Sequence, residues 1–466
     1  MEVDYLISGA GASGLAFLDT LVHESDATVA IVDRRDAPGG HWVDAYPFVN
    51  LHQPSSFYGV NSKPLGQNRL TATGINRGLP EVASKHEILH YFRDLMDNTL
   101  LPTGRVTYLK NSEHLGDGRV RSLVTGEETQ ITVRKKFVDA GYFGEHITIP
   151  ATHERPFDVD PGVDCVPLND LPKVASQHED FVVLGAGKTA MDAVLWLLET
   201  GIPQDKITWV RPNDYWIFQR DFIVPHRDFF DVTVDSIRHE TESLATSKTV
   251  EEHCLRLEAE GRWQRIDRDY WPTRFHAATC SNAELEALRT VENVVRLGRV
   301  KRITPTQMEL AEGTHPISGQ PLFVDCTGAA NISLDRKLKV FDGNVITLML
   351  VRPFQPVFSS ALIAHLECGD YNDTIRQFAT QVTNFHHTPA DYIAVQRQGF
   401  MNQYMWNQNP AIRAWVDASR LNAGTHLTAH LTREDTEQIG KLKSLGALMA
   451  QAVDNIPKML AASADS

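Results

Sequence analysis

The feature that most constrains this 466-residue chain is a glycine-rich turn that occurs twice, each time between a strand pattern and a helix pattern. Residues 3–8 form an apolar strand pattern, residues 9–14 are Gly-Ala-Gly-Ala-Ser-Gly, and an apolar helical pattern follows at once. Residues 28–33 form a second strand pattern. A right-handed crossover makes the two strands parallel and places the glycine turn at the carboxyl edge of their sheet.

The second copy begins with the strand pattern 181–184, followed by the turn Gly-Ala-Gly-Lys-Thr-Ala at 185–190 and another helical pattern. Residues 207–210 form the next strand pattern. The two turns are 176 positions apart, counted from Gly9 to Gly185. The chain is therefore expected to contain two α/β units of the same design.

The glycine turns indicate dinucleotide binding, because glycine lets backbone amides and a helix N-terminus approach a pyrophosphate. Asp33 ends the second strand of the first unit, 19 residues past Gly14. A carboxylate there accepts hydrogen bonds from a ribose 2′-hydroxyl and repels a 2′-phosphate, which fits FAD or NAD. In the second unit Arg211 follows the strand, and no carboxylate comes before Asp214. A guanidinium suits a 2′-phosphate, so this unit favours NADPH, unless Arg211 is an ordinary surface arginine.

A Gly-Gly-His-Trp stretch at residues 39–42 follows Asp33 closely. Its glycines allow close backbone approach, and its tryptophan is a flat partner for an aromatic ring, although a turn with a core tryptophan fits the same letters. The predicted cofactor-binding residues of the two units are Gly9, Gly11, Ser13, Gly14, Asp33, Arg34, Gly40, His41 and Trp42, then Gly185, Gly187, Lys188, Thr189 and Arg211.

With these motifs in this order, the chain resembles the flavoproteins that have two dinucleotide-binding domains, especially the class B flavin-containing and Baeyer–Villiger monooxygenases. The resemblance covers roughly residues 1–370. It implies FAD on the first unit and NADPH on the second. NADPH would deliver hydride to FAD, molecular oxygen would then form a peroxyflavin, and one oxygen atom would be transferred to a small organic substrate while the other leaves as water. The motifs that carry it are the two turns, Asp33 with 39–42, Tyr46-Pro47 with the Tyr58 region, Arg211, and the strand ends Val-Asp-Ala-Gly (138–141) and Val-Asp-Cys-Thr-Gly (324–328).

The resemblance also implies roles for individual residues. Thr327 and Gly328 would lie near the flavin. His52 falls where the family places a polar side chain beside the flavin ring, although a structural histidine is the alternative. Arg274 would match the arginine that Baeyer–Villiger enzymes set against the peroxyflavin. Gln355 starts an apolar helical pattern whose N-terminus could stabilise negative charge on the flavin, unless it is an ordinary core helix.

The predicted fold class is therefore α/β, with two Rossmann-like dinucleotide-binding domains, the second inserted in the first, and a helical C-terminal region. The predicted boundaries are 1–165 and 320–369 for the two parts of the FAD domain, 166–319 for the NADPH domain, and 370–466 for the helical region. That last region is expected either to close the substrate site or to form the face of a homodimer.

One departure from the family favours a second function. The monooxygenases carry Phe-x-Gly-x-x-x-His-x-x-x-Tyr/Trp before the second turn, whereas residues 156–167 lack the histidine and the closing aromatic residue. The alternative is an FAD-dependent NAD(P)H oxidoreductase or oxidase without oxygen insertion. A non-catalytic nucleotide sensor is a third interpretation, which the two intact turns disfavour.

Composition excludes several other classes. A net charge of −14 disfavours nucleic acid as a partner, and no apolar run reaches the roughly 18 residues that span a bilayer. Five scattered cysteines and the absence of a signal-like start lead us to expect a cytoplasmic protein. His86-Glu-Ile-Leu-His90 matches a zinc-protease signature, but Ser84 and Glu87 fit a capping box and no third ligand is evident, so no metal site is predicted.

Two further patterns concern the substrate side of the molecule. Beyond residue 370 the chain is predicted to be helical, with a 3.6-residue period through 375–385 and helix starts at Thr388 and Thr432. An aromatic cluster at Tyr215, Trp216, Phe218 and Phe222 either lines a substrate cavity or packs in the core.

Overall fold

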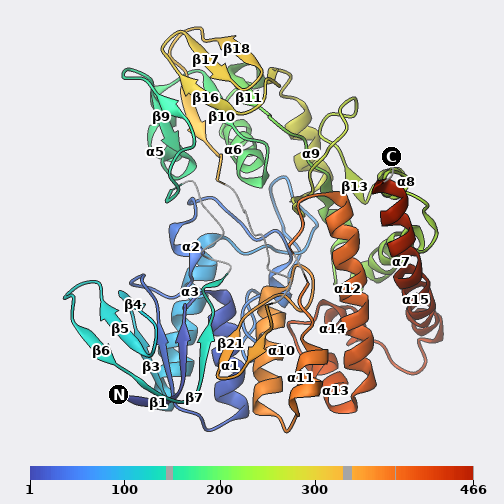
Figure 1. Cartoon of the computed structure of the whole chain (residues 1–466). Helices are drawn as coiled ribbons and strands as arrows, with labels where there is room; N and C mark the ends of the chain where they lie inside the picture. The colour runs from blue at the N-terminus through green and yellow to red at the C-terminus, as the bar shows by residue number, and fades with distance from the viewer. Residues whose placement is uncertain (143–150, 329–337, 384, 465–466) are drawn as a thin grey trace.

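The structure, a computed structural model, describes residues 1–142, 151–328, 338–383 and 385–464. The two glycine turns belong to two separate sheets, drawn at the bottom and the top of Figure 1. The last helices of the chain stand beside both units on the right of that view. The predicted α/β fold class, with two Rossmann-like units and a helical C-terminal region, is confirmed.

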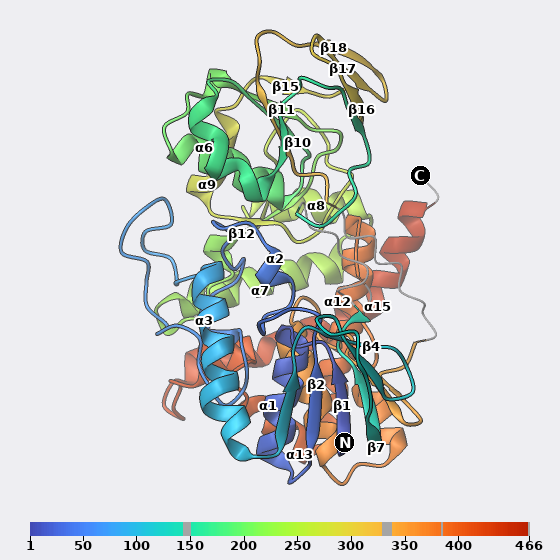
Figure 2. The ribbon, with the colours of Figure 1, turned by 90° about the vertical axis from the view of Figure 1, so that its left-hand side faces the viewer.

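The first sheet has six strands in the order β20-β21-β7-β1-β2-β3, and β1 pairs in parallel with both β2 and β7. All four residues of β2 are buried, as expected for a parallel strand covered on both faces. Helices α1 and α10 pack against each other (Figure 1), and Figure 2 shows α1 beside β1 and β2. The elements are β1 (Glu2–Ser8), α1 (Ala12–Glu24), β2 (Val29–Val32), α2 (His41–Asp44), α3 (Lys85–Leu95), β3 (Val106–Leu109), β7 (Thr132–Asp139), β20 (Phe341–Asp342), β21 (Val345–Thr347) and α10 (Pro356–Cys368).

A small antiparallel sheet in the order β4-β5-β6 comes before β7 along the chain. Its strands are β4 (Ser112–His114), β5 (Arg119–Ser122) and β6 (Glu128–Gln130).

The second sheet has five strands in the order β15-β11-β10-β19-β9, and β10 pairs in parallel with β11 and β19. Because β19 belongs to this sheet, the chain returns to the first sheet later than residue 320, the predicted boundary. The elements of this part, including a four-stranded sheet β18-β17-β16-β8, are β8 (Asp158–Val159), β9 (Cys165–Pro167), α5 (Leu171–Val174), β10 (Phe181–Leu184), α6 (Lys188–Glu199), β11 (Ile207–Val210), α9 (Asn282–Arg289), β15 (Val294–Val295), β16 (Val300–Ile303), β17 (Gln307–Leu310), β18 (Gly313–Pro316) and β19 (Leu322–Asp325).

An insertion between β11 and α9 contains two helices that sequence reasoning missed. Helix α7 (Phe230–Thr246) buries Phe230, Val234 and Leu244. Their spacing places them on one face of a helix, so the periodicity of the sequence does indicate this helix. Helix α8 (Val250–Ala259) follows it, and the short strands β12 (Ile217–Gln219), β13 (Trp263–Gln264) and β14 (Thr279–Cys280) form a third small sheet.

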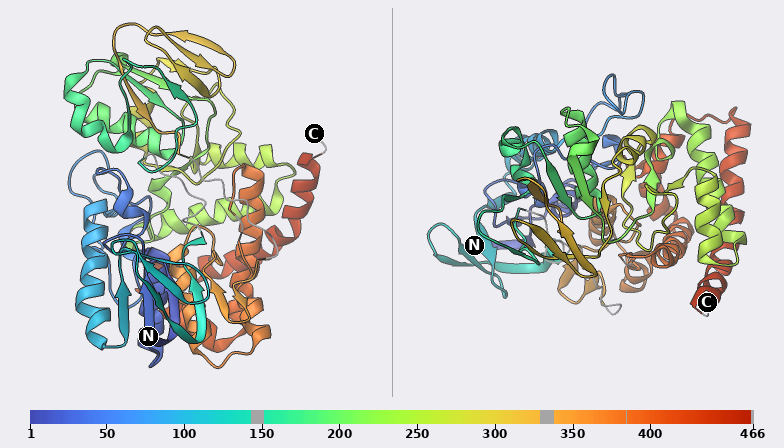
Figure 3. Two further views of the ribbon diagram at one scale, coloured as in Figure 1. Left: turned by 60° about the vertical axis from the view of Figure 1, so that its left-hand side comes forward. Right: turned by 90° about the horizontal axis from the view of Figure 1, so that it is seen from above.

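The C-terminal helices pack on this insertion. Helix α15 contacts α7, α8 and α12, so the end of the chain is joined to the second unit (Figures 1 and 3). Thr388 caps its helix as predicted. The helices are α11 (Asp373–Ala379), α12 (Pro389–Gln408), α13 (Pro410–Ala418), α14 (Ala423–Thr428) and α15 (Thr436–Ala464).

Two helix predictions in this region were wrong in extent. The helical period continued to Phe385, but α11 ends at Ala379, and residues 380–383 and 385 are not helical. Thr432 does not cap a helix directly, because its hydroxyl and amide both donate to Asp435 in a turn before α15 begins at Thr436. Local hydrogen bonding by a threonine competes with helix formation at such positions.

Within the described parts of the chain, no helix combines the length and the apolar character needed to cross a bilayer. The capping box predicted for Ser84 and Glu87 is present at the start of α3.

Candidate functional site

The first glycine turn is held against the end of strand β7. Gly9 has a φ of +111°, and a Cβ added to it would lie 3.2 Å from the carbonyl carbon of Ala140. A Cβ on Gly14 would overlap the carbonyl oxygen of Gly9, so the helix can start this close to the turn only with glycine there. Gly11 caps α1 with an extended backbone and leaves the first helical amides free of a side-chain cap.

The Gly-Gly stretch at 39–40 packs directly on this turn. The Gly39 N–H donates to the Ala10 carbonyl (2.9 Å), and a Cβ on Gly40 would lie 2.8 Å from the Cα atom of Gly11. Asp33 joins the same arrangement, because its Oδ2 atom accepts a 2.7 Å hydrogen bond from the Ala10 amide. Three predicted residues, Gly11, Asp33 and Gly40, are therefore brought together around one backbone cradle.

A single cavity of about 1500 Å³ extends from this cradle. Roughly 300–1,000 Å³ is typical of one small-molecule site, so this cavity has room for more than one ligand. Its first part is lined by the cradle and its surroundings, namely Ser8, Gly9, Gly11, Ala12, Ser13, Val32, Asp33, Arg34, Arg35, Gly40, His41, Asp44, Ser112, Glu113, His114, Asp139, Ala140 and Gly141.

The second part of the cavity is rich in aromatic and apolar side chains, and we call it the aromatic chamber. It is defined by the lining residues between 218 and 279 and between 350 and 427, which come from β12, the α7 region, the loop before α10, α12 and α14. Of the aromatic cluster predicted at 215–222, Phe218 and Phe222 line this chamber, whereas Trp216 is fully buried in the core.

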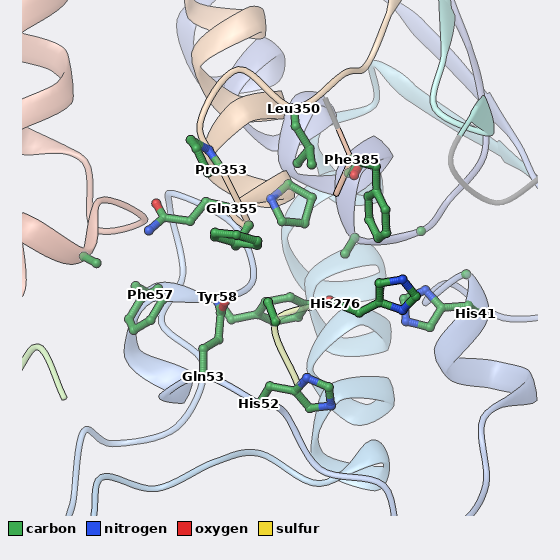
Figure 4. A pocket seen from close by; sticks show the side chains of 18 of the residues that line it. His41, His52, Gln53, Phe57, Tyr58, His276, Leu350, Pro353, Gln355 and Phe385 are labelled. Atoms are coloured by element: carbon green, nitrogen blue, oxygen red, sulfur yellow. The ribbon is translucent and has the colours of Figure 1, made fainter. Parts of the chain in front are cut away.

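His52, Gln53, Phe57 and Tyr58 also line the cavity (Figure 4). His52 faces the cavity, and desolvation followed by the charges of Lys188 and Arg220 lowers its pKa well below the usual value. The His52 side chain is exposed to the cavity. With its lowered pKa, the imidazole is neutral at pH 7. Gln53 and Gln355 also line the cavity, and within the described residues the Gln53 Nε2 and Gln355 Oε1 atoms have no hydrogen-bond partner.

The second glycine turn has the same local geometry as the first. Gly187 caps α6 with φ −79° and ψ −177°, the values that Gly11 has at α1. Gly185 has a φ of +124°, and its added Cβ would lie 2.8 Å from the Cys326 carbonyl oxygen. A Cβ on Gly187 would meet open space within 4 Å, which leaves room for a ligand to approach the turn.

Polar side chains around the second turn already have protein partners. Lys188 forms an ion pair with Asp192, whose Oδ2 atom also accepts a 2.5 Å hydrogen bond from the Tyr46 hydroxyl of the first unit. The Trp209 indole donates to the Gly185 carbonyl (2.7 Å). The start of α6 is therefore linked to the first unit through Asp192.

Arg211 is buried, with 3% of its surface exposed, so it is not a surface arginine. It forms an ion pair with Asp214 and stacks over Trp209, 5.0 Å from the ring centre. Asp214 is shared with Arg296, so one carboxylate lies between two guanidinium groups. Burial and the charge of Arg296 lower the pKa of Arg211 to about 9.

Only some of the predicted site residues line the large cavity. Gly9, Gly11, Ser13, Asp33, Arg34, Gly40, His41, His52 and Gln355 line it, whereas Gly14, Trp42, Gly185, Gly187, Lys188, Thr189, Arg211, Arg274, Thr327 and Gly328 do not.

The reasons differ among the residues that do not line it. Trp42 is buried and donates through its indole to the Tyr58 hydroxyl (2.8 Å). Arg274 pairs through its backbone with Tyr215 beside the chamber. Thr327 follows β19 in the second sheet, where its amide and hydroxyl donate to Asp325. Tyr215 lies 59 positions before Arg274, so that pairing could not be read from local sequence.

Sequence reasoning also missed several residues that line the chamber. His276 follows Arg274 by two positions, and Glu240, His386 and Tyr392 come from α7, from the segment before α12 and from α12 itself. The helical period of 230–244 would have identified α7, but nothing local marks Glu240 as facing a cavity. No group of three or more potential metal ligands is found among the described residues.

Comparison with solved structures gives low identity over most of the chain. A polycyclic ketone monooxygenase from Thermothelomyces thermophila is 13% identical, with a TM-score of 0.50, and the match covers 97% of this chain and 88% of that one. A steroid monooxygenase bound to NADP (12%, TM-score 0.49) is matched over 98% of this chain and 99% of its own. The first of these matches shows a shared fold.

Comparison of sequences gives much closer relatives. No protein-family model matches the chain. Uncharacterised proteins from Mycobacterium tuberculosis and Mycobacterium bovis are each 39% identical to it over 461 residues, which is 99% of this chain and 85% of their own length. The chain therefore belongs to the same family as these mycobacterial proteins.

Proposed function

We propose that the protein is an FAD- and NADPH-dependent monooxygenase that acts on a small organic substrate. The observation that carries this proposal is one continuous cavity with a glycine cradle and Asp33 at one end and an aromatic chamber at the other. The cradle suits a flavin nucleotide and the chamber suits an organic molecule. The fold shared with a polycyclic ketone monooxygenase is in keeping with this assignment.

The residues of the first part of the cavity fit FAD. Gly11 and Gly40 bring two backbones so close that side chains would fill the cradle, and the free amides at the start of α1 suit a pyrophosphate. Asp33 suits a ribose hydroxyl. The unpartnered Gln53 Nε2 and Gln355 Oε1 atoms offer one donor and one acceptor to a polar ring edge.

FAD, when bound, supplies hydride acceptance and the chemistry of molecular oxygen. The chain supplies positioning and electrostatics. Gln355 and Pro356 place the N-terminus of α10 at the cavity, where its positive partial charge stabilises a developing negative charge. His52, neutral at pH 7, can donate or accept one hydrogen bond. The apolar chamber keeps water away from the reacting groups.

The second glycine turn supports NADPH as the hydride donor. Gly187 leaves open space at the α6 N-terminus, and Arg211 and Arg296 supply cationic groups at the carboxyl end of β11. Asp214 would have to share these arginines with a 2′-phosphate. Arg211 thus remains our candidate for that phosphate.

The stated alternative is an NAD(P)H oxidoreductase or oxidase without oxygen insertion. It is favoured by residues 156–167, which lack the histidine and the closing aromatic residue of the monooxygenase motif. The two functions differ in the fate of oxygen.

The test is to reduce the purified protein anaerobically with NADPH, admit oxygen, and measure hydrogen peroxide with and without an organic substrate. A monooxygenase should form an oxygenated product and release less than one hydrogen peroxide per NADPH. Release of one hydrogen peroxide per NADPH with every substrate would favour the alternative.

A further inference from the structure

The aromatic chamber has walls from segments far apart in the chain. Phe222 and Ile223 follow β12, Ile237 lies on α7, and Val395 and Phe400 lie on α12. Such a wall binds a molecule mainly by removing apolar surface from water. The chamber therefore suits a bulky apolar ligand.

The charges of the chamber are balanced within the protein. Among its described lining residues, Glu240 and Arg262 are the two that carry a charge at pH 7, and they form an ion pair with each other. Glu240 also accepts a hydrogen bond from the Tyr392 hydroxyl, and Arg262 donates to Ser236. No net charge is left to receive a charged ligand group, and burying an unpaired charge is costly.

Three buried polar atoms of the chamber have no hydrogen-bond partner among the described residues, namely Arg262 Nε, Gln355 Oε1 and His386 Nε2. Arg262 belongs to the ion pair and Gln355 is assigned above to the flavin, which leaves His386 for the substrate. His386 is 3% exposed and lines the chamber, and its Nε2 atom has no hydrogen-bond partner among the described residues. Phe354 and Tyr392 pack around the imidazole at 4.8 and 5.9 Å between ring centres. Burial is the main cause that lowers the pKa of His386 to about 3, so the ring is neutral at pH 7. A neutral imidazole nitrogen pairs with a hydroxyl as acceptor or with a carbonyl as donor.

Backbone strain is stored in the same walls. Phe354 has a φ of +61° and Ala277 a φ of +53°, and both line the chamber. A left-handed backbone at a non-glycine residue is unfavourable and is found preferentially at ligand sites. The Phe354 ring stacks on Tyr392, with 5.7 Å between ring centres and 24° between ring planes.

We propose that the aromatic chamber binds the organic substrate as an uncharged, ring-containing apolar molecule, and that an oxygen atom of this molecule forms a hydrogen bond with His386 Nε2. The inference rests on the proposed function, since it names the substrate class of that site. It excludes ammonium and carboxylate compounds of the same size.

The first experiment uses calorimetric titration of the purified protein, as isolated, with three naphthalenes that carry an acetyl, an aminomethyl or a carboxyl group. The acetyl compound should bind, and the two charged compounds should bind at least about tenfold more weakly. Equal or tighter binding of either charged compound would overturn the proposal.

Two variants locate the site. His386→Phe keeps the ring shape and should weaken binding of acetylnaphthalene about fivefold while leaving methylnaphthalene, which has no oxygen, unchanged. Gly424 lines the chamber at the start of α14, so Gly424→Trp should abolish binding of both compounds. Gly446→Trp, on an exposed position of α15, is the matched control and should bind both normally.

Unchanged binding in Gly424→Trp would show that the chamber is not the site. An equal loss of acetyl and methyl compounds in His386→Phe would overturn the role of His386. Flavin content and reduction by NADPH are measured on the same preparations. If flavin is bound and reduced but no probe binds, only this inference fails, whereas probe binding without flavin contradicts the proposed function alone.

Discussion

The backbone N–H of Ala10 donates a 2.7 Å hydrogen bond to Oδ2 of Asp33, so the carboxylate at the end of β2 is fixed against the first glycine turn. The other oxygen, Oδ1, accepts from the Arg35 amide at 2.9 Å. Asp33 is buried at 6% exposure yet lines the cavity. These two backbone hydrogen bonds fix the orientation of the carboxylate.

Asp33→Asn should weaken FAD binding by roughly ten- to hundredfold. The amide replaces a charged acceptor, and hydrogen bonds to charged groups contribute about 1.5–3 kcal/mol. The dissociation constant is measured by fluorescence titration of flavin-depleted protein. Asp36→Asn, at an exposed neighbouring position outside the cavity lining, should bind FAD normally. Equal affinities in the parent and both variants would refute the role of Asp33.

Arg211→Ala should lower the preference for NADPH over NADH by about tenfold, because a charged contact to the 2′-phosphate is lost. Asp214→Asn should shift the preference the other way, since the carboxylate that lies between Arg211 and Arg296 is removed. For each variant, the preference is measured as the ratio of the dissociation constants for NADH and NADPH. Lys206→Ala removes a cation at the opposite end of β11 and should leave the ratio unchanged. A parent-like ratio in Arg211→Ala would remove Arg211 from the site.

The two glycines of the second turn should respond differently to alanine. Gly185→Ala should destabilise the protein by about 1–3 kcal/mol, because φ is +124° and the Cβ meets Cys326. Gly187→Ala should leave the unfolding midpoint nearly unchanged but weaken NADPH binding about tenfold or more, since its Cβ projects into the open space beside the turn. Denaturant unfolding and coenzyme titration separate the two effects. Normal NADPH affinity in Gly187→Ala would place the coenzyme elsewhere.

Acid should destabilise the protein through His253. This side chain is fully buried, its Nδ1 atom lies 2.8 Å from the Ser243 hydroxyl oxygen, and desolvation lowers its pKa to about 3. The unfolded histidine, with a pKa near 6.5, binds a proton that the folded one does not, so stability falls as pH drops below about 6.5.

At about pH 5, His253 alone lowers the free energy of unfolding by about 2 kcal/mol. His253→Gln should reduce the difference in unfolding midpoint between about pH 7.5 and pH 5, relative to the parent. His86→Gln, at an exposed position of α3, serves as the control and should leave that difference as it is. An identical pH dependence in His253→Gln and the parent would contradict this assignment.

The sequence was sufficient for the parts of the fold that depend on local backbone geometry. Both glycine turns, with their strands and helices, follow from residues within about 30 positions of each other, because glycine is required where a turn meets a neighbouring strand. The position of Asp33 followed from the same local pattern.

Side-chain roles that depend on distant partners could not be predicted in this way. Trp42 was expected to be either a flat partner for a cofactor ring or a core residue; it is buried, and its indole donates to the Tyr58 hydroxyl. Arg211 was interpreted either as a contact for the 2′-phosphate or as a surface arginine. The structure buries it and pairs it with Asp214. His386 reaches the chamber only because helices far along the chain pack on the insertion that holds α7.

The most direct test of the central claim, that the first glycine cradle holds a flavin nucleotide, is the flavin content of the purified protein. The cofactor is released by denaturation, identified by chromatography and quantified against protein. The account predicts about one FAD per chain in the parent, retained by Gly187→Ala and reduced in Asp33→Asn. A parent protein that contains no flavin and takes up none when FAD is added would contradict it.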